Sequence, residues 1–236
     1  MRRKIVAALL GAALAAAVAY TAQAGVSSGG GRCASYNPHP PSAAHFSKAI
    51  DNRYFPLPVG RTFVYRGAEN GKQELDRMHV TGRTKKIAGI TATVVSDNVY
   101  EPPPKLLEKT FDYYAQDYRG HVWYLGEDTR EFLSGGKVGT SGSWLAGRGG
   151  AKPGLIMEAD PRVPDAYRQE CLSGEAEDLA WVVGRGGRRG LLRTLEFSPL
   201  EPSIVERKVY RPRVGVISEQ QLSGGHETLS LVRVTG

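Results

Sequence analysis

The stretch FDYYAQDYRGHVWYLGEDT, residues 111–129, holds two runs of aromatic and β-branched residues separated by the tetrapeptide DYRG. An Asp at the first place and a Gly at the fourth suit a type I turn closed by a glycine bulge. Such a turn fixes the register of the two runs as strands. The register pairs Asp117 with His121, Tyr114 with Tyr124 and Ala115 with Trp123. The stretch therefore predicts a β-hairpin.

Side chains alternate between the two faces of a strand, so the hairpin has two distinct faces. One face is apolar and is expected to be core, because burying its aromatic area is the largest favourable term available. It holds Phe111, Tyr113, Ala115, Trp123 and Leu125. The other face mixes carboxyl, amide and phenol groups. It holds Asp112, Tyr114, Gln116, Val122, Tyr124 and Asp128. This second face meets water in an open sheet and lines a cavity in a barrel or half-barrel.

Short β-branched and aromatic runs continue from Tyr54 to the C-terminus. They are separated by turn signals such as ENGK at 69–72 and SGGK at 134–137. The links are too short for crossover helices, which favours antiparallel neighbours. We predict a mainly β protein, a single antiparallel meander forming a curved sheet, half-barrel or barrel. Residues 175–183, EAEDLAWVV, fit either a short helix or a strand.

The N-terminus has the build of a secretory signal. Three basic residues precede an apolar run, and Ala22-Gln23-Ala24 is a small-x-small cleavage site. We expect a cleaved signal peptide at 1–24, a Gly/Ser/Pro-rich arm at 25–46 and a β domain at 47–236. The protein is expected to be exported to the periplasm or secreted, with no membrane span after signal cleavage.

The charge balance is mildly basic. The whole chain carries +7, and removal of the three basic residues of the signal leaves 7 − 3 = +4. Charge alone therefore does not indicate a nucleic acid partner. The run GRGGRRG, with Arg185, Arg188 and Arg189, lacks interleaved aromatic residues and reads as a solvated turn.

Two cysteines remain after signal cleavage, and an even pair in an oxidising compartment more often bridges than stays free. We predict a disulfide between Cys33 and Cys171. It would tie the N-terminal arm to the β domain.

Other acids could join the polar face of the hairpin, although spacing does not place them together: Glu170, Glu175, Glu177, Asp178, and Glu206 beside Lys208. Paired carboxylates also suit glycoside hydrolysis or a Ca²⁺ site. The sequence holds no DxDxDG loop, and no spacing singles out one carboxylate pair. We therefore expect no metal site and no cofactor, and we leave catalytic residues unassigned.

Several phrases resemble a group of exported bacterial proteins and lipoproteins of undefined function. They are YFPLPVGRTFVYRG at 54–67, FDYYAQD, VWYLGEDT, GAKPGLIM at 150–157, YRQE at 167–170, EAED and PLEP at 199–202. The resemblance implies an exported, mostly β protein, and it supplies no reaction or cofactor. Tyr113 stands where the group leads us to expect Trp.

Three functions remain open on these observations. The leading hypothesis is a non-enzymatic protein that binds a small or amphiphilic ligand. Its predicted ligand-binding residues are Asp112, Tyr114, Gln116, Tyr124, Asp128, Glu170 and Glu177. The alternatives are a carboxylate-dependent hydrolase acting on an envelope or extracellular polymer, and an interaction module without a pocket. The sequence does not indicate an oligomeric state.

Overall fold

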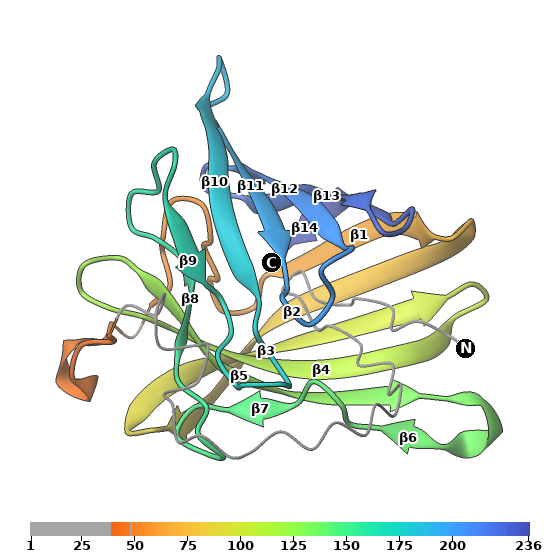
Figure 1. The fold of residues 1–236 in the computed structure, drawn as a ribbon, viewed down its shortest axis with the longest axis horizontal. Coiled ribbons are helices and arrows are strands. Elements are labelled where there is room, and N and C mark those ends of the chain that lie inside the picture. Colours follow the sequence, from red (N-terminus) through yellow and green to blue (C-terminus); the bar gives the residue numbers. More distant parts are fainter. Residues whose placement is uncertain (1–38, 48) are drawn as a thin grey trace.

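The computed structural model describes residues 39–47 and 49–236, and its ribbon is drawn in Figure 1. The described chain forms one antiparallel sheet of 14 strands. The first strands are β1 (Thr62–Glu69), β2 (Lys72–Ile87), β3 (Ile90–Glu101), β4 (Lys105–Gln116), β5 (Val122–Phe132), β6 (Val138–Gly139) and β7 (Trp144–Leu145). The others are β8 (Gly154–Met157), β9 (Ala166–Arg168), β10 (Leu179–Gly186), β11 (Leu191–Phe197), β12 (Val205–Arg211), β13 (Gly215–Ser223) and β14 (Thr228–Thr235). Two short 3₁₀ helices, η2 (Ala43–His45) and η3 (Ser134–Gly136), complete the elements.

The sheet is two meanders joined in the middle. Strands β1 to β6 follow each other outward on one side, β14 back to β9 follow on the other, and β1 pairs with β14 at the seam. Both β7 and β8 pair with β5 beside this path. Figure 1 shows the sheet curling so that β9 comes to lie beside β8, which pairs with β5. The predicted curved antiparallel sheet is thus confirmed, and it is not closed into a barrel.

The hairpin prediction is confirmed in turn and register. The backbone N–H of Asp117 donates to the carbonyl of His121 at 2.9 Å, and Gly120 has a φ of 94°. Tyr114 pairs with Tyr124 and Ala115 with Trp123. The Asp117 carboxylate strengthens the turn, because it accepts hydrogen bonds from the Arg119 and His121 amides and from the Trp123 indole.

A bulge at Gly126 changes the register farther from the turn. Tyr114 pairs with Tyr124, but Asp112 pairs with Glu127, so β5 holds one more residue than β4 between these pairs. A Cβ at Gly126 would lie 2.2 Å from the carbonyl oxygen of Trp144, so β7 packs directly on this glycine. Our placement of Asp128 was therefore wrong. Asp128 lies opposite Phe111 on the other face, and Glu127 takes its place.

Both faces of the hairpin are buried near the turn. Trp123 is 3% exposed and Leu125 is 0% exposed, as expected of core. Phe111 is only half-buried, with Arg83 and Lys109 over its ring at 5.3 and 5.0 Å. The carboxyl-bearing face is equally dry, since Tyr114 and Tyr124 are both 0% exposed. An open sheet with this face in water is therefore excluded.

The segment at 50–57 packs across the inner face at the turn end of the hairpin. Gln116 anchors it, because its side-chain carbonyl accepts hydrogen bonds from the Asp51 and Asn52 amides at 3.0 and 2.8 Å. Phe55 then meets Tyr114 edge to face, with ring centroids 5.3 Å apart. Tyr54 donates to the carbonyl of Gly190 at 3.0 Å. This segment thus links the two halves of the sheet.

Two further predictions concern less regular segments. Residues 175–183 contain the start of β10, which decides the ambiguity in favour of a strand. At the end of the predicted arm, Phe46 forms a bridge with Asp117. The rest of the arm up to residue 38, the signal at 1–24 and Cys33 lie outside the described residues. Within the described ranges, no helix is long and apolar enough to cross a membrane.

Candidate functional site

Tyr114 and Tyr124 form the aromatic centre of the inner face. Their rings stack with centroids 4.8 Å apart and planes 18° from parallel. The Tyr124 hydroxyl donates to Asp112 Oδ1 and also lies 3.0 Å from Glu127 Oε2. Burial, and then the charges of Asp112 and Glu127, raise the pKa of both tyrosines well above its usual value. Both phenols therefore remain protonated hydrogen-bond donors.

Buried carboxyl groups continue from this centre across the inner face. We call the set the acidic belt. Its members are Asp76, Asp97, Asp112, Glu127, Glu170, Asp178, Glu196, Glu206, Glu219 and Glu227. Their charges act on one another: Asp97 acts on Asp112, Glu127 on Glu170, and Glu219 on Asp76. The belt thus spans strands from both halves of the sheet. These groups share one interior.

Asp76 on β2 and Asp97 on β3 form a carboxyl pair. Each side chain hydrogen-bonds the other, which requires that one of them hold a proton. Burial is the main cause that raises the pKa of Asp76 to about 7, and the charge of Glu219 adds to it. Burial and the charge of Asp76 raise the pKa of Asp97 as well. At neutral pH the pair therefore carries less than two negative charges.

Lys208 supplies a cation to the other half of the belt. It is 0% exposed, and its ammonium lies 2.8 Å from Glu196 and 3.7 Å from Glu219. Although burial disfavours its charge, the surrounding glutamates raise the pKa of Lys208 above its usual value. Burial still raises the pKa of Glu219, while Lys208 opposes this rise. This end of the belt is therefore an ion cluster.

The remaining predicted residues have different positions. Glu170 belongs to the belt, where burial and the charge of Asp178 raise its pKa. Glu177 is used locally, because its Oε1 accepts a hydrogen bond from the amide of Gly174 at 2.8 Å. Gln116 shares the inner face but is occupied in anchoring residues 51 and 52. Cys171 is buried, and its predicted bond to Cys33 stays a prediction.

Most of the belt was missed from sequence. A usable signal exists in the spacing of two between polar residues within a strand, which places both on one face. Glu74 and Asp76 follow this spacing on β2, and Glu206 and Lys208 follow it on β12. The alternation alone does not show which face of the strand is buried. It is therefore equally consistent with acids that face the solvent and with acids that face the interior.

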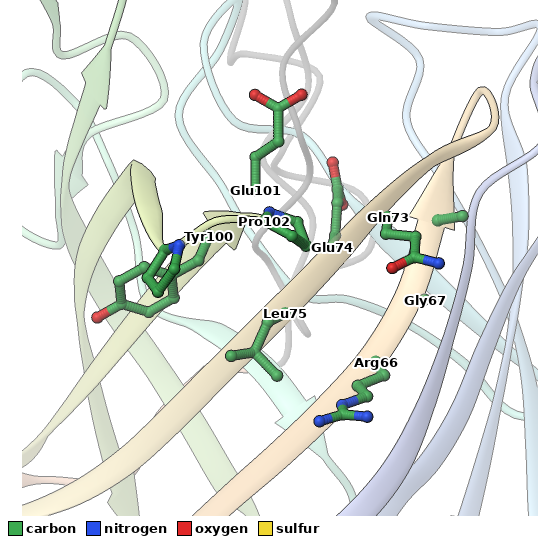
Figure 2. A pocket seen from close by; sticks show the side chains of 10 residues that line it. Arg66, Gly67, Gln73, Glu74, Leu75, Tyr100, Glu101 and Pro102 are labelled. Carbon is green, nitrogen blue, oxygen red and sulfur yellow. The ribbon is translucent and has the colours of Figure 1, made fainter.

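A separate hollow of about 630 Å³ lies at the far ends of β1 to β3. Figure 2 shows Leu75 and Arg66 pointing away from the side taken by Glu74 and Glu101. Leu75, Tyr100 and the prolines give the hollow an apolar part, while Arg66 and Gln73 give it polar groups. Glu74 links this region to the belt, since its charge helps to raise the pKa of Glu227 to about 9, after burial and Glu206.

Within residues 39–47 and 49–236, no group of three or more His, Cys, Asp or Glu side chains has the arrangement of a metal site. Seven acids of the belt lie on seven different strands, whereas Glu170, Asp178 and Glu227 lie in the connections before β10 and β14. Their contacts include tyrosines, Lys208, each other and hydroxyl groups such as that of Thr194, which donates to Glu196. The arrangement can hold and exchange protons and can attract a positively charged group.

Comparison with known proteins identifies similar solved structures. A candidate exported protein with a YmcC-like fold from Bacteroides fragilis has a TM-score of 0.44 and 12% identity, covering 78% of this chain and 100% of its own. A candidate lipoprotein from Parabacteroides distasonis has a TM-score of 0.41 and 9% identity, covering 78% of this chain and 99% of its own. No family model matches the sequence. No curated protein shows significant similarity to it.

Proposed function

We propose that this chain is an exported, non-enzymatic binding protein that holds a small, positively charged ligand against the acidic belt. Export rests on the signal-like residues 1–24. Binding rests on the inner face of the curved sheet, the same face on which the hairpin places Tyr114 and Tyr124. Coordination by a metal or cofactor is not part of the proposal.

The observation that carries this function is the imbalance of buried charge. The ten acids of the belt are buried, against two buried basic side chains among the described residues, Lys208 and Arg168. The proton shared with Asp97 is the donor that the described residues offer to Asp76, and Asp178 Oδ1 has no donor within hydrogen-bond distance in that part of the chain. Buried carboxyls without donors cost several kcal/mol in order of magnitude, so a purely structural core favours apolar residues here. A cationic ligand supplies the missing donors and charge.

The aromatic centre adds an apolar part to this site. Tyr114, Tyr124 and Phe55 present ring surface next to Asp112 and Glu127. A positively charged group also binds favourably to the face of an aromatic ring, by about 0.5 to 2 kcal/mol. An amine that carries a short apolar group matches this combination better than a fully polar cation. The proposed ligand is therefore small and amphiphilic.

Calorimetric titration with a matched pair of probes tests the proposal. Phenethylammonium and 2-phenylethanol have nearly the same shape but differ in charge. We expect the amine to bind and the alcohol to bind at least tenfold more weakly. Titrations in two buffers of different ionisation enthalpy should also show proton release, because a nearby cation lowers the raised pKa values of the belt.

Variants distinguish the belt from the rest of the acidic surface. Asp76→Asn combined with Asp97→Asn removes the carboxyl pair while keeping its size, and we expect at least tenfold weaker amine binding. Asp128→Asn is the matched control, because Asp128 lies on the other face. Equal binding by both variants, or equal affinity for amine and alcohol, contradicts the proposal.

A further inference from the structure

Four arginines meet at one surface hollow of about 780 Å³, which we call the arginine hollow. They are Arg53, Arg188, Arg189 and Arg213. They come from three separate places: the segment before β1, the turn between β10 and β11, and the turn between β12 and β13. The sequence explained only Arg188 and Arg189, as part of a solvated turn. The fold adds Arg53 and Arg213, which are distant in the chain.

Backbone contacts hold the three segments together. The amide of Arg213 donates to the carbonyl of Arg53 at 2.7 Å. Tyr54 donates to the carbonyl of Gly190 at 3.0 Å. A Cβ at Gly190 would lie 3.7 Å from both Arg53 Nη2 and Pro212 Cγ, which shows how closely the segments approach. The backbone positions of the arginines are therefore held by contacts between the three segments, although the arginine side chains are exposed.

The charge of these arginines is not balanced locally. Among the described residues, no acid forms an ion pair with any of the four guanidinium groups. Asp51 also lines the hollow, but its carboxylate accepts a hydrogen bond from Gln116 Nε2 at 2.6 Å. Arg185 on neighbouring β10 differs, since Asp160 pairs with it and also with Arg162. Arg162 and Arg185 thus have an acid partner, whereas the four arginines of the hollow have no ion-pair partner among the described residues.

We propose that the arginine hollow binds a multivalent anion, one that carries several phosphate or carboxylate groups. Guanidinium groups bind such oxyanions with two parallel hydrogen bonds, and several around one hollow can contact several anionic groups at once. Like charges placed together repel each other, and an anion relieves this repulsion. The segment at 50–57 contributes to both sites from opposite sides: its exposed Arg53 lines the hollow, and its buried Phe55 packs on Tyr114 beside the acidic belt, so the two sites are distinct.

Fluorescence titration at low and moderate salt tests this site with three labelled probes. Linear hexaphosphate and hexagalacturonate differ in the source of charge, and maltohexaose is the neutral control. We expect at least one of the two anions to bind, with an affinity that falls as salt rises, and maltohexaose not to bind. Binding of hexaphosphate alone assigns phosphate groups, and binding of hexagalacturonate alone assigns carboxylates.

A charge-matched pair of variants makes the test specific to the hollow. The test variant combines Arg188→Gln, Arg189→Gln and Arg213→Asn. Asn is used because Arg213 has a φ of 65°, which Asn tolerates. The control variant changes the same number of exposed arginines elsewhere, with Arg77→Gln, Arg130→Gln and Arg148→Gln.

The test variant should bind the anion at least tenfold more weakly, and the control variant should stay within twofold of the original chain. Thermal melting of both variants establishes that they are folded. Equal weakening in both would mean that net charge alone attracts the probe, and it would overturn the proposal. So would the absence of binding to both anions.

Discussion

The two halves of the sheet bury carboxyl groups in different ways. In the half built from β2 to β4, Asp76 and Asp97 hydrogen-bond each other, and burial raises the pKa values of both. In the half built from β11 to β13, Glu196 and Glu219 surround Lys208. The first half thus limits buried charge by holding protons, and the second by supplying a cation. One acidic interior can therefore have two different responses to pH.

The largest effect on stability is expected from removal of the buried cation. Lys208→Met leaves the buried glutamates without their partner, and removing one member of a buried ion cluster costs about 3 to 5 kcal/mol. We expect a loss of that order in the free energy of unfolding, measured by urea denaturation at pH 7. Lys86→Met, at an exposed position of β2, is the control and should change stability by less than about 0.5 kcal/mol.

A second variant separates charge from packing at this site. Lys208→Met with Glu196→Gln and Glu219→Gln should recover part of the lost stability, because the glutamates no longer need a cation. If the single and triple variants are equally unstable, packing of the lysine chain is more important than its charge.

The carboxyl pair Asp76 and Asp97, in the half built from β2 to β4, should make the stability of the chain depend on pH. The pKa of Asp76 rises to about 7 in the folded state, above its ordinary value of 3.8, so the folded chain holds more protons than the unfolded chain between these values. Stability contributed by this proton is complete below the ordinary value and is lost as pH rises through about 7. The free energy of unfolding of the original chain should therefore fall as pH rises from 5 to 8. In the variant Asp76→Asn with Asp97→Asn, this fall should be smaller by roughly 2 kcal/mol.

Urea denaturation at several pH values checks this expectation. The Lys208→Met variant is the useful reference, because it keeps the aspartate pair and should keep the pH dependence assigned to it. Parallel curves for the original chain and the double Asn variant would contradict the assignment.

The smallest expected effect concerns the bulge at Gly126. Glu127 is 2% exposed and lies at the Tyr124 hydroxyl, whereas Asp128 lies on the other face. Glu127→Ala should cost roughly 1 to 2 kcal/mol, because it removes a buried hydrogen-bond partner. Asp128→Ala should cost less than about 0.5 kcal/mol. Thermal or urea unfolding compares the two, and a larger loss for Asp128→Ala would contradict the role assigned to Glu127.

Local patterns predicted most of the fold. The DYRG turn, the strand on each side of it and the pairing of Tyr114 with Tyr124 all follow from nearby residues. The error began at Gly126, where a glycine inside a strand is itself a bulge signal. That bulge depends on the close approach of the Trp144 carbonyl, which comes from a later part of the chain. Sequence spacing within the hairpin carries no information about this contact.

The candidate site was much less predictable. Asp112 was identified from the alternation of faces in the hairpin and Glu170 as one of several acids that could join it, whereas Glu177 accepts a hydrogen bond within a turn. Asp76, Asp97 and Lys208 were missed, since isolated charged residues in strands normally face solvent. Only the curvature of the sheet puts them inside.

By itself, the sequence determined that the chain forms antiparallel strands, where its hairpins turn, and that its N-terminus has the features of an export signal. These properties depend on backbone preferences, short-range alternation and local composition. Only the tertiary structure decided which face is enclosed, which acids share a proton, which acids surround Lys208, and that Arg53 and Arg213 join the arginines of a distant turn. The physical reason is range: burial and charge interactions act through space between strands far apart in the chain, and spacing along one strand does not encode them.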